Sequence, residues 1–535
     1  MKLFSTVRAA PVLLKLLVLA CALGTLPAAQ AAAGLPSNNT AWVAAATDAD
    51  VDRAFARARA EKKPLLLYWG ASWCPPCNQL KATLFNRQDF AVLARSFVPV
   101  SVDGDRPGAQ KLGQRFKVVG YPTTVLFSAD GKEITRLPGE VDAPQALAVL
   151  QLGLASGRPI KAVLANALQG RPLAATEWRL LAFYSWDTDE GQLVSKVDRP
   201  GLLVRLAVAG STTPAAAEPE VTTRLWLKAL AASDEGQGVK PDAALRERLM
   251  RVLADPAQAR LQMDLLVASA PDMVRNFESA DPEFGAAPSR APLLAAYDTA
   301  LQRLQNDATL SRADRQSALT ARVELARLDL PKSAVQLQLP EPLLKEVRDF
   351  VARADSDITD GYERQAVITE AAFLLGRAGL WPQSDALLVA NLTKSHSPYY
   401  LMSQLAGNAR KLGRTADALR WYGQAHAQSE GASTRLQWGS SYLTALVELS
   451  PQDSATIEKT AAQLLTEAAR DRSAFEGRSA RSLQRAGAQL IGWNTAGRHA
   501  AVLRRLQVQL DAVCAKVGAP DARRACTSVL KPKST

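Results

Sequence analysis

Hydrophobic and polar positions alternate between strand-like and helix-like spacing from residue 47 to residue 155. Residues 65–70 ("LLLYWG") are apolar throughout, which is typical of a strand buried on both faces. Asp130-Gly131 predicts a hairpin turn between the last two strands. The other predicted strands are residues 97–103, 123–128 and 132–137. With helices between them, the expected order is α, β, α, β, α, β, β, α.

Beyond residue 155 the apolar positions follow helical spacing, as in the stripe formed by Leu343, Val347 and Val351. Gly379 and Gly413 lie 34 residues apart, and Asp-Ala-Leu follows each of them. That distance is the period of a tetratricopeptide helix pair. The pattern therefore predicts a large all-α, helical-repeat (solenoid-like) region. Its expected segments are helices at 156–360, tetratricopeptide-like pairs at 361–470, and C-terminal helices at 471–535.

The N-terminus has the pattern of a secretory signal. Basic residues precede a short apolar run at 16–27, and residues 29–31 form a small-x-small cleavage site. We predict a signal peptide at 1–31, a linker at 32–46, and a periplasmic or otherwise exported mature protein. Cys21 raises lipid anchoring as an alternative, which the bulky Leu19 disfavours. No later segment is apolar enough to span a membrane, so we expect no stable membrane insertion after cleavage.

Composition changes this picture little. The 535 residues are 47% hydrophobic and 22% charged, as in ordinary globular proteins. The formal net charge is +12, but the basic residues alternate with acids and form no cluster. Because nucleic-acid binding needs a clustered basic surface, we expect no nucleic-acid partner.

Removal of Cys21 with the signal peptide would leave two close cysteine pairs. Cys514 and Cys526 flank a turn between two predicted helices, which suits a structural disulfide in an exported protein. Cys74 and Cys77 are separated only by two prolines. The Cys74/Cys77 pair has three competing interpretations: a metal site, a structural link or a redox pair.

The residues themselves favour the redox interpretation of Cys74 and Cys77. A zinc site needs about four ligands, and the three histidines all lie beyond residue 390, so we predict no metal and no cofactor. A disulfide that closes so short a loop restrains little chain entropy. Cys74, by contrast, stands where a buried strand gives way to a helix, whose N-terminus favours a thiolate. Cys77 follows one turn later, close enough to attack a mixed disulfide.

Two further motifs carry a family resemblance. "WCPPC" follows the apolar strand, and "GYPTTVLF" with Pro122 precedes the hairpin and Gly139. Together they resemble the thioredoxin superfamily, and in particular periplasmic domains similar to the C-terminal domain of the thiol:disulfide interchange reductase. The resemblance covers about residues 42–155, and we predict a thioredoxin-like domain at 47–155.

The resemblance implies a role for each matching position. Cys74 would be the attacking nucleophile and Cys77 the resolving cysteine. Pro122 would be a cis-proline beside the disulfide, and Trp73 and Tyr121 would line the substrate groove. Tyr68 is a departure, because thioredoxins commonly carry a buried aspartate at this position, six residues before the first cysteine.

We therefore expect an exported thiol-disulfide oxidoreductase that acts on protein disulfides, as a reductase or isomerase. Its partners would be those substrates and a thiol-disulfide protein that donates or accepts electrons. The helical region would bind a client or partner. The alternative is a helical-repeat scaffold protein whose thioredoxin-like domain serves docking or redox sensing.

Overall fold

The computed structural model describes residues 40–118, 120–139, 142–189, 191–213, 218–233, 237–277, 290–331, 333–471 and 473–531. All of them belong to one compact unit, Leu35–Thr535. The predicted signal peptide, Cys21 and the first part of the predicted linker lie outside the described residues.

A five-stranded sheet with strand order β1-β3-β2-β4-β5 forms the centre of the α/β domain. The strands are β1 (Val43–Ala45), β2 (Leu65–Gly70), β3 (Val98–Asp103), β4 (Thr123–Phe127) and β5 (Glu133–Arg136). β1 and β2 run parallel to β3, whereas β4 is antiparallel to β2 and to β5. All six residues of the central β2 are buried.

Helices cover both faces of the sheet, which explains the unbroken apolar run of β2. Leu65, Leu67 and Trp69 pack in one core with α1 and α4. Leu66 and Tyr68 point to the other face, into a core that includes α5 and the first part of the helical region. The helices are α1 (Asp48–Glu61), α2 (Pro75–Leu80), α3 (Gln88–Leu93), α4 (Ala109–Arg115) and α5 (Ala143–Ser156), and the π-helical turn Lys81–Phe85 extends α2.

Two elements of this domain differ from the sequence expectation. The residues of β1 were assigned to the linker, but they pair with β3 at the edge of the sheet. The strand has three residues and pairs with a segment more than fifty positions away, so its local pattern gives little signal. α3 was also not expected, because its six residues are too few to show helical periodicity.

After residue 156 every regular element in the described ranges is helical, as expected. The helices are α6 (Ile160–Leu168), α7 (Ala175–Phe183), α8 (Arg199–Thr212), α9 (Pro219–Ala232), α10 (Ala243–Ala254), α11 (Pro256–Leu261), α12 (Met263–Ala268), α13 (Ala270–Asn276), α14 (Ala291–Asn306), α15 (Arg312–Ala326), α16 (Glu341–Asp357), α17 (Gly361–Arg377), α18 (Trp381–Asn391), α19 (Pro398–Lys411), α20 (Thr415–Gln428), α21 (Ala432–Leu449), α22 (Ser454–Ala468), α23 (Gly477–Trp493), α24 (Ala500–Cys514) and α25 (Pro520–Thr527). Short 3-10 turns occur at Trp186–Thr188 and Thr495–Gly497.

The two glycines of the suspected repeat occupy equivalent places. Gly379 lies between α17 and α18, Gly413 lies between α19 and α20, and their φ angles are +80° and +72°. Glycine adopts this left-handed conformation without strain, so both residues serve as helix-ending turns. The chain therefore has repeated helix pairs here, while their assignment to the tetratricopeptide family stays a prediction.

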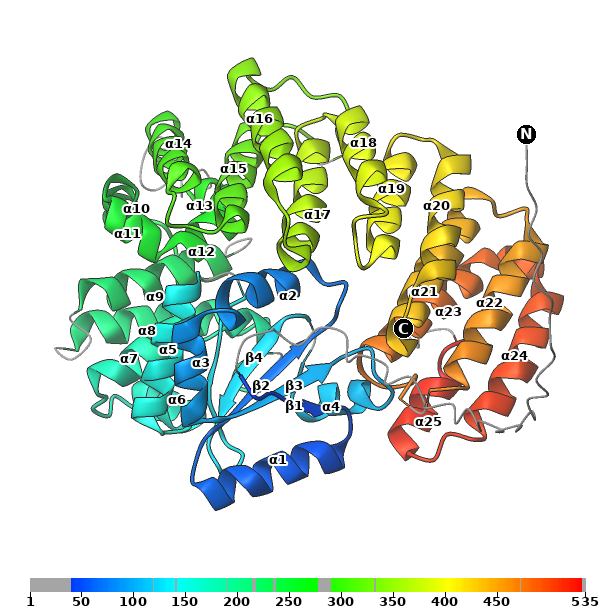
Figure 1. Cartoon of the computed structure of the whole chain (residues 1–535), viewed down its shortest axis with the longest axis horizontal. Helices are drawn as coiled ribbons and strands as arrows, with labels where there is room; N and C mark the ends of the chain where they lie inside the picture. Colours follow the sequence, from blue (N-terminus) through cyan, green and yellow to red (C-terminus); the bar gives the residue numbers. More distant parts are fainter. Residues whose placement is uncertain are drawn as a thin grey trace, which may run out of the picture. The chain divides into compact units, whose positions relative to one another are not determined.

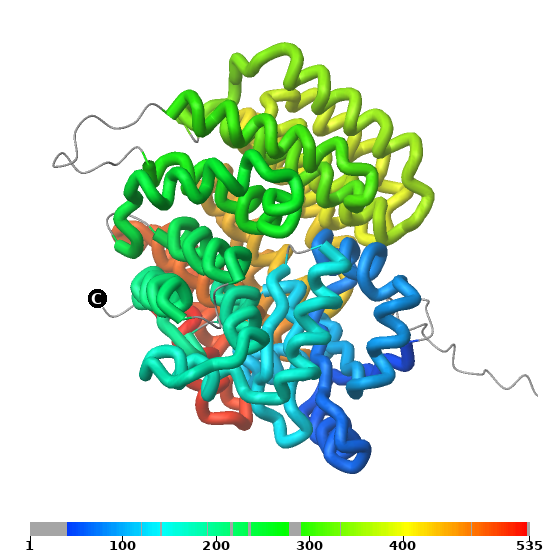
Figure 2. The backbone as a smooth tube through the Cα atoms, turned by 90° about the vertical axis from the view of Figure 1, so that its left-hand side faces the viewer, coloured from blue at the N-terminus to red at the C-terminus, as the bar shows by residue number. Residues whose placement is uncertain are grey.

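The helical region packs directly against the α/β domain. α17 contacts α2, and α23 contacts α4. Figure 1 shows α17 beside α2, and the view turned by 90° in Figure 2 again places the yellow-green helices next to the blue segment. Helices far along the sequence thus lie next to the segment that carries Cys74 and Cys77.

Among the described helices none is by itself long and apolar enough to cross a membrane, and α5 and α6 pass that test only together, across an 81° bend.

Candidate functional site

The cysteine pair lies where β2 passes into α2. Cys74 is the N-cap residue of α2, and its Sγ accepts a hydrogen bond from the Cys77 backbone N–H at 3.2 Å. The two cysteines form a disulfide. Pro75 and Pro76 occupy the first helical turn, where an absent N–H costs no hydrogen bond. The free N–H groups and dipole of the helix therefore point at the sulfur of Cys74.

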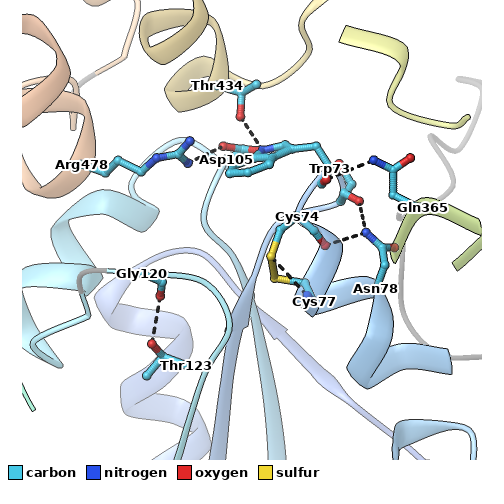
Figure 3. The surroundings of a disulfide bond; sticks show 11 residues. Trp73, Cys74, Cys77, Asn78, Asp105, Gly120, Thr123, Gln365, Thr434 and Arg478 are labelled. Atoms are coloured by element: carbon cyan, nitrogen blue, oxygen red, sulfur yellow. Dashed lines mark hydrogen bonds and ion pairs between the residues drawn. A yellow bond between two sulfur atoms is a disulfide. The ribbon is translucent and has the colours of Figure 1, made fainter. Parts of the chain in front are cut away.

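The loop before Cys74 is held by Asn78, which is fully buried on α2. Its Nδ2 donates to the carbonyl oxygens of Ser72 at 2.7 Å and Cys74 at 2.8 Å (Figure 3). These bonds hold Trp73 and Cys74 in place relative to the helix. The sequence analysis did not single out Asn78, although a buried amide one turn after a cap residue is typical of such a role.

Pro122 follows a cis peptide bond from Tyr121, as the resemblance implies. The hydroxyl of Tyr121 accepts a hydrogen bond from Gln110 Nε2 at 2.9 Å, and the same nitrogen donates to the carbonyl of Gly104 at 2.7 Å. The ring centroids of Tyr121 and Trp73 are 6.1 Å apart. The structure therefore brings together all five site residues that were proposed around the first cysteine pair.

The helical region covers this site. Cys74 is 3% exposed, Cys77 0% and Trp73 8%. Trp73 stacks on Tyr400 at a centroid distance of 5.8 Å and lies 5.6 Å from Trp438. Trp438 was not singled out by the sequence analysis. Side chains of the helical region thus fill the face that Trp73 would offer to a substrate.

A buried polar cluster accompanies the aromatic contacts. The indole nitrogen of Trp73 lies 2.8 Å from both Asp105 Oδ2 and Thr434 Oγ1, to which its N–H donates (Figure 3). The Arg478 guanidinium lies 4.6 Å from the centre of the Trp73 ring and 3.9 Å from Asp105 Oδ1. Burial raises the pKa of Asp105 to about 6, and Arg478 opposes this rise.

Comparison with known proteins agrees with this geometry. Residues 51–153 match the family model of the thioredoxin-like domain. These residues are a thioredoxin-like domain.

This domain is similar to thiol:disulfide interchange proteins of two bacteria. The thioredoxin-like domain is 31% identical over 116 residues to thiol:disulfide interchange protein DsbD 2 of Pseudomonas aeruginosa, covering 21% of this chain and 20% of that protein. It is 35% identical over 112 residues to thiol:disulfide interchange protein DsbD of Cronobacter sakazakii, covering 19% and 18%. The chain spans about a fifth of the length of these relatives.

Two solved structures are also similar. A thioredoxin from Thermus thermophilus is 27% identical, with a TM-score of 0.19, covering 22% of this chain and 92% of that one. A structure titled DsbH Oxidoreductase is 21% identical, with a TM-score of 0.18, covering 21% and 88%.

The side chain of Tyr68 lies on the same side of β2 as Cys77. The Tyr68 hydroxyl is buried without a hydrogen-bond partner within the described ranges, and burial raises the pKa of Tyr68 far above its usual value. A Cβ atom at Gly70 would lie 2.4 Å from this hydroxyl and 3.3 Å from Cys77 Sγ, so the two groups lie on the same side of β2. Burial also raises the pKa of Asp103 and lowers that of Lys81 to about 8.

The second cysteine pair forms a disulfide between Cys514, at the end of α24, and Cys526 in α25, with a Cα–Cα distance of 5.7 Å. Both residues are buried. They belong to a hydrophobic cluster of α21–α25 that does not include Cys74 or Cys77. In the part of the chain that the structure describes, no three His, Cys, Asp or Glu residues are grouped as metal ligands.

Proposed function

We propose that this protein is an exported thiol-disulfide oxidoreductase that acts on cysteine-containing proteins or peptides through Cys74 and Cys77. One observation carries the proposal: a Cys-x-x-Cys disulfide caps a helix in a thioredoxin-like domain whose Tyr121–Pro122 peptide bond is cis. The similarity to thiol:disulfide interchange proteins supports the same chemistry.

In the reducing direction the reaction begins with the dithiol form. The Cys74 thiolate attacks one sulfur of a substrate disulfide, and the other substrate sulfur leaves as a thiolate that takes a proton. The Cys77 thiolate then attacks Cys74 Sγ, which releases the second substrate thiol and forms the Cys74–Cys77 disulfide. Two electrons have passed to the substrate. A thiol-disulfide protein must supply two electrons to reduce the Cys74–Cys77 disulfide again. In an isomerase, another thiolate of the substrate would attack the mixed disulfide and release the Cys74 thiolate, with no net transfer of electrons.

The structure supports unequal roles for the two sulfurs. Cys74 Sγ accepts the Cys77 N–H at the helix start, an arrangement that stabilises negative charge on Cys74. Cys77 is fully buried and has Tyr68 on its side of the strand, so it suits an internal attack on Cys74.

The direct test is reduction of insulin with dithiothreitol as electron donor. We expect the wild-type chain to accelerate the reaction and Cys74→Ser to return it to the uncatalysed rate, because the nucleophile is lost. Cys514→Ala with Cys526→Ala is the matched control and should retain catalysis. Equal rates for wild type and Cys74→Ser would contradict the proposal.

A second function is favoured by the burial of the pair. Because Trp73 and Cys74 lie under α19 and α21, the oxidation state of the pair could control how the thioredoxin-like domain holds a helical-repeat scaffold. Cys77→Ser separates the two functions, since it traps substrates as mixed disulfides. Trapping of several proteins favours the enzyme. Binding of a partner without any covalent adduct favours the scaffold or redox sensor.

A further inference from the structure

A cavity of about 330 Å³ borders the first turn of α2 on the side of Pro75. Pro75, Pro76, Gln79 and Gly139 form the wall on the thioredoxin-like domain, and α12, α15 and α17 supply the rest. Its volume is near the lower end for small-ligand sites, about 300–1,000 Å³. Pro75 directly follows Cys74. The cavity therefore borders the helical turn that Cys74 caps.

Gln316 of α15 gives the cavity an unsatisfied polar group. Its side chain is 2% exposed, and neither Nε2 nor Oε1 has a hydrogen-bond partner within the described ranges. A buried amide without partners is unfavourable, and such a group indicates a partner outside the protein itself. The amide offers one donor face and one acceptor, the same set that a peptide group offers. Gln316 therefore suits pairing with a peptide backbone.

The charge of the cavity selects among peptides. Four carboxylates lie among its lining residues and no lysine or arginine does. Asp264 is neutralised by Arg224, and Glu324 by Arg377. Asp314 instead accepts hydrogen bonds from the neutral Gln79 Nε2 at 3.0 Å and Ser311 Oγ at 2.7 Å. Neither contact brings a positive charge to Asp314, and burial raises the pKa of this carboxyl, so a cationic ligand would stabilise its carboxylate form.

We propose that this cavity binds a short, extended cysteine-containing peptide with a basic residue next to the cysteine, in which Gln316 pairs with a peptide group. The ligand's sulfur then lies at the first turn of α2, beside Cys74. The inference rests on the proposed function for the reaction that follows, but binding itself needs no cysteine chemistry.

The test measures binding without redox chemistry. Isothermal titration uses the full chain carrying Cys74→Ser and Cys77→Ser, with two acetylated and amidated probes, Ala-Lys-Cys-Lys-Ala and Ala-Glu-Cys-Glu-Ala. We expect the lysine peptide to bind and the glutamate peptide to bind at least about tenfold more weakly. Gln316→Leu should weaken binding of the lysine peptide about tenfold, because its peptide group loses two hydrogen bonds.

Two further variants keep the test independent of folding. Ser317→Phe, at an exposed position of the cavity rim, should also weaken binding. Gln302→Leu, an exposed substitution on α14, should not change it. The unfolding midpoint of Gln316→Leu should equal or exceed that of its parent, because an unpaired buried amide is removed.

Equal affinity for both peptides, or unchanged affinity in both Gln316→Leu and Ser317→Phe, would overturn the inference. A chain that binds the lysine peptide but fails the insulin assay would instead count against the proposed function, and the two failures are distinguishable.

Discussion

Hydrogen bonds and ring stacking connect Trp73 to three helices of the helical region, in addition to the contact of its ring with Arg478 of α23. Its carbonyl oxygen accepts a hydrogen bond from Gln365 Nε2 of α17 at 3.2 Å. Its ring stacks on Tyr400 of α19, and its N–H reaches Thr434 of α21. A buried tryptophan with its N–H satisfied contributes both apolar area and orientation. The residue before the nucleophile is therefore also a contact between the two regions of the chain.

Asp105 makes this contact pH-dependent. Its pKa is about 6 in the folded protein against an ordinary value of 3.8, so the folded state binds the proton more tightly than the unfolded chain. The free energy of unfolding therefore falls as the pH rises from about 4 to about 6, and it stays lowered above that range.

Asp105→Asn should remove this dependence while its amide oxygen still accepts the Trp73 N–H. Relative to wild type, the variant should gain about 2 kcal/mol of unfolding free energy between pH 4.5 and pH 7.5. Urea unfolding at the two pH values measures the difference. Asp521→Asn, at an exposed carboxyl on α25, is the control and should show no such change. If the gain in unfolding free energy of Asp105→Asn over wild type is the same at both pH values, the carboxylate is not destabilised by burial.

At the scale of elements, the sequence predicted the parts whose pattern is local. β2, the helix that starts at Cys74, the hairpin at Asp130-Gly131 and α5 all have a characteristic run of residues. The placement of Pro122 beside the cysteines came from the family resemblance, because the two segments are nearly fifty residues apart in the sequence.

The remaining elements depend on contacts that no local pattern encodes. β1 exists because β3 offers it a pairing edge. The cover over Trp73 depends on Thr434, which is 361 residues away in the sequence. Helical spacing in α19 could not indicate that Tyr399 and Tyr400 pack against the redox site.

Close packing between α23 and the segment after α25 leaves no room for a side chain at Gly487 in α23. A Cβ atom there would lie 1.9 Å from the backbone oxygen of Val529, which follows α25. Gly487→Ala should therefore lower the free energy of unfolding by about 1–3 kcal/mol, because α25 must shift. Gly492→Ala in the same helix is the matched control, since a Cβ there meets nothing within 4 Å. Denaturant unfolding would contradict this packing if both alanine variants were equally stable.

For the whole molecule, the helical region limits access to Cys74. The hydrophobic cluster around the disulfide contains Trp73, Cys74 and Cys77 from the thioredoxin-like domain, and Tyr399, Met402 and Trp438 from the helical region. A large folded substrate cannot reach a sulfur that is this deeply buried. Reaction with such a substrate requires the two regions to separate locally, and the frequency of separation then limits the rate.

Trp438→Ala should raise the population of the separated state. Trp438 contacts Trp73 only when the regions are packed, and each 1.4 kcal/mol lost from that state alone raises the open fraction about tenfold. Alkylation of Cys74 by iodoacetamide, measured by peptide mass spectrometry in the Cys77→Ser background, should therefore be at least about tenfold faster in Trp438→Ala. Trp226→Ala, a partly buried tryptophan packed in other clusters, should leave the rate unchanged. If Cys74 is alkylated at one rate in all three proteins, its sulfur is reached without separation of the two regions, and the helical region does not limit access of a small reagent to Cys74.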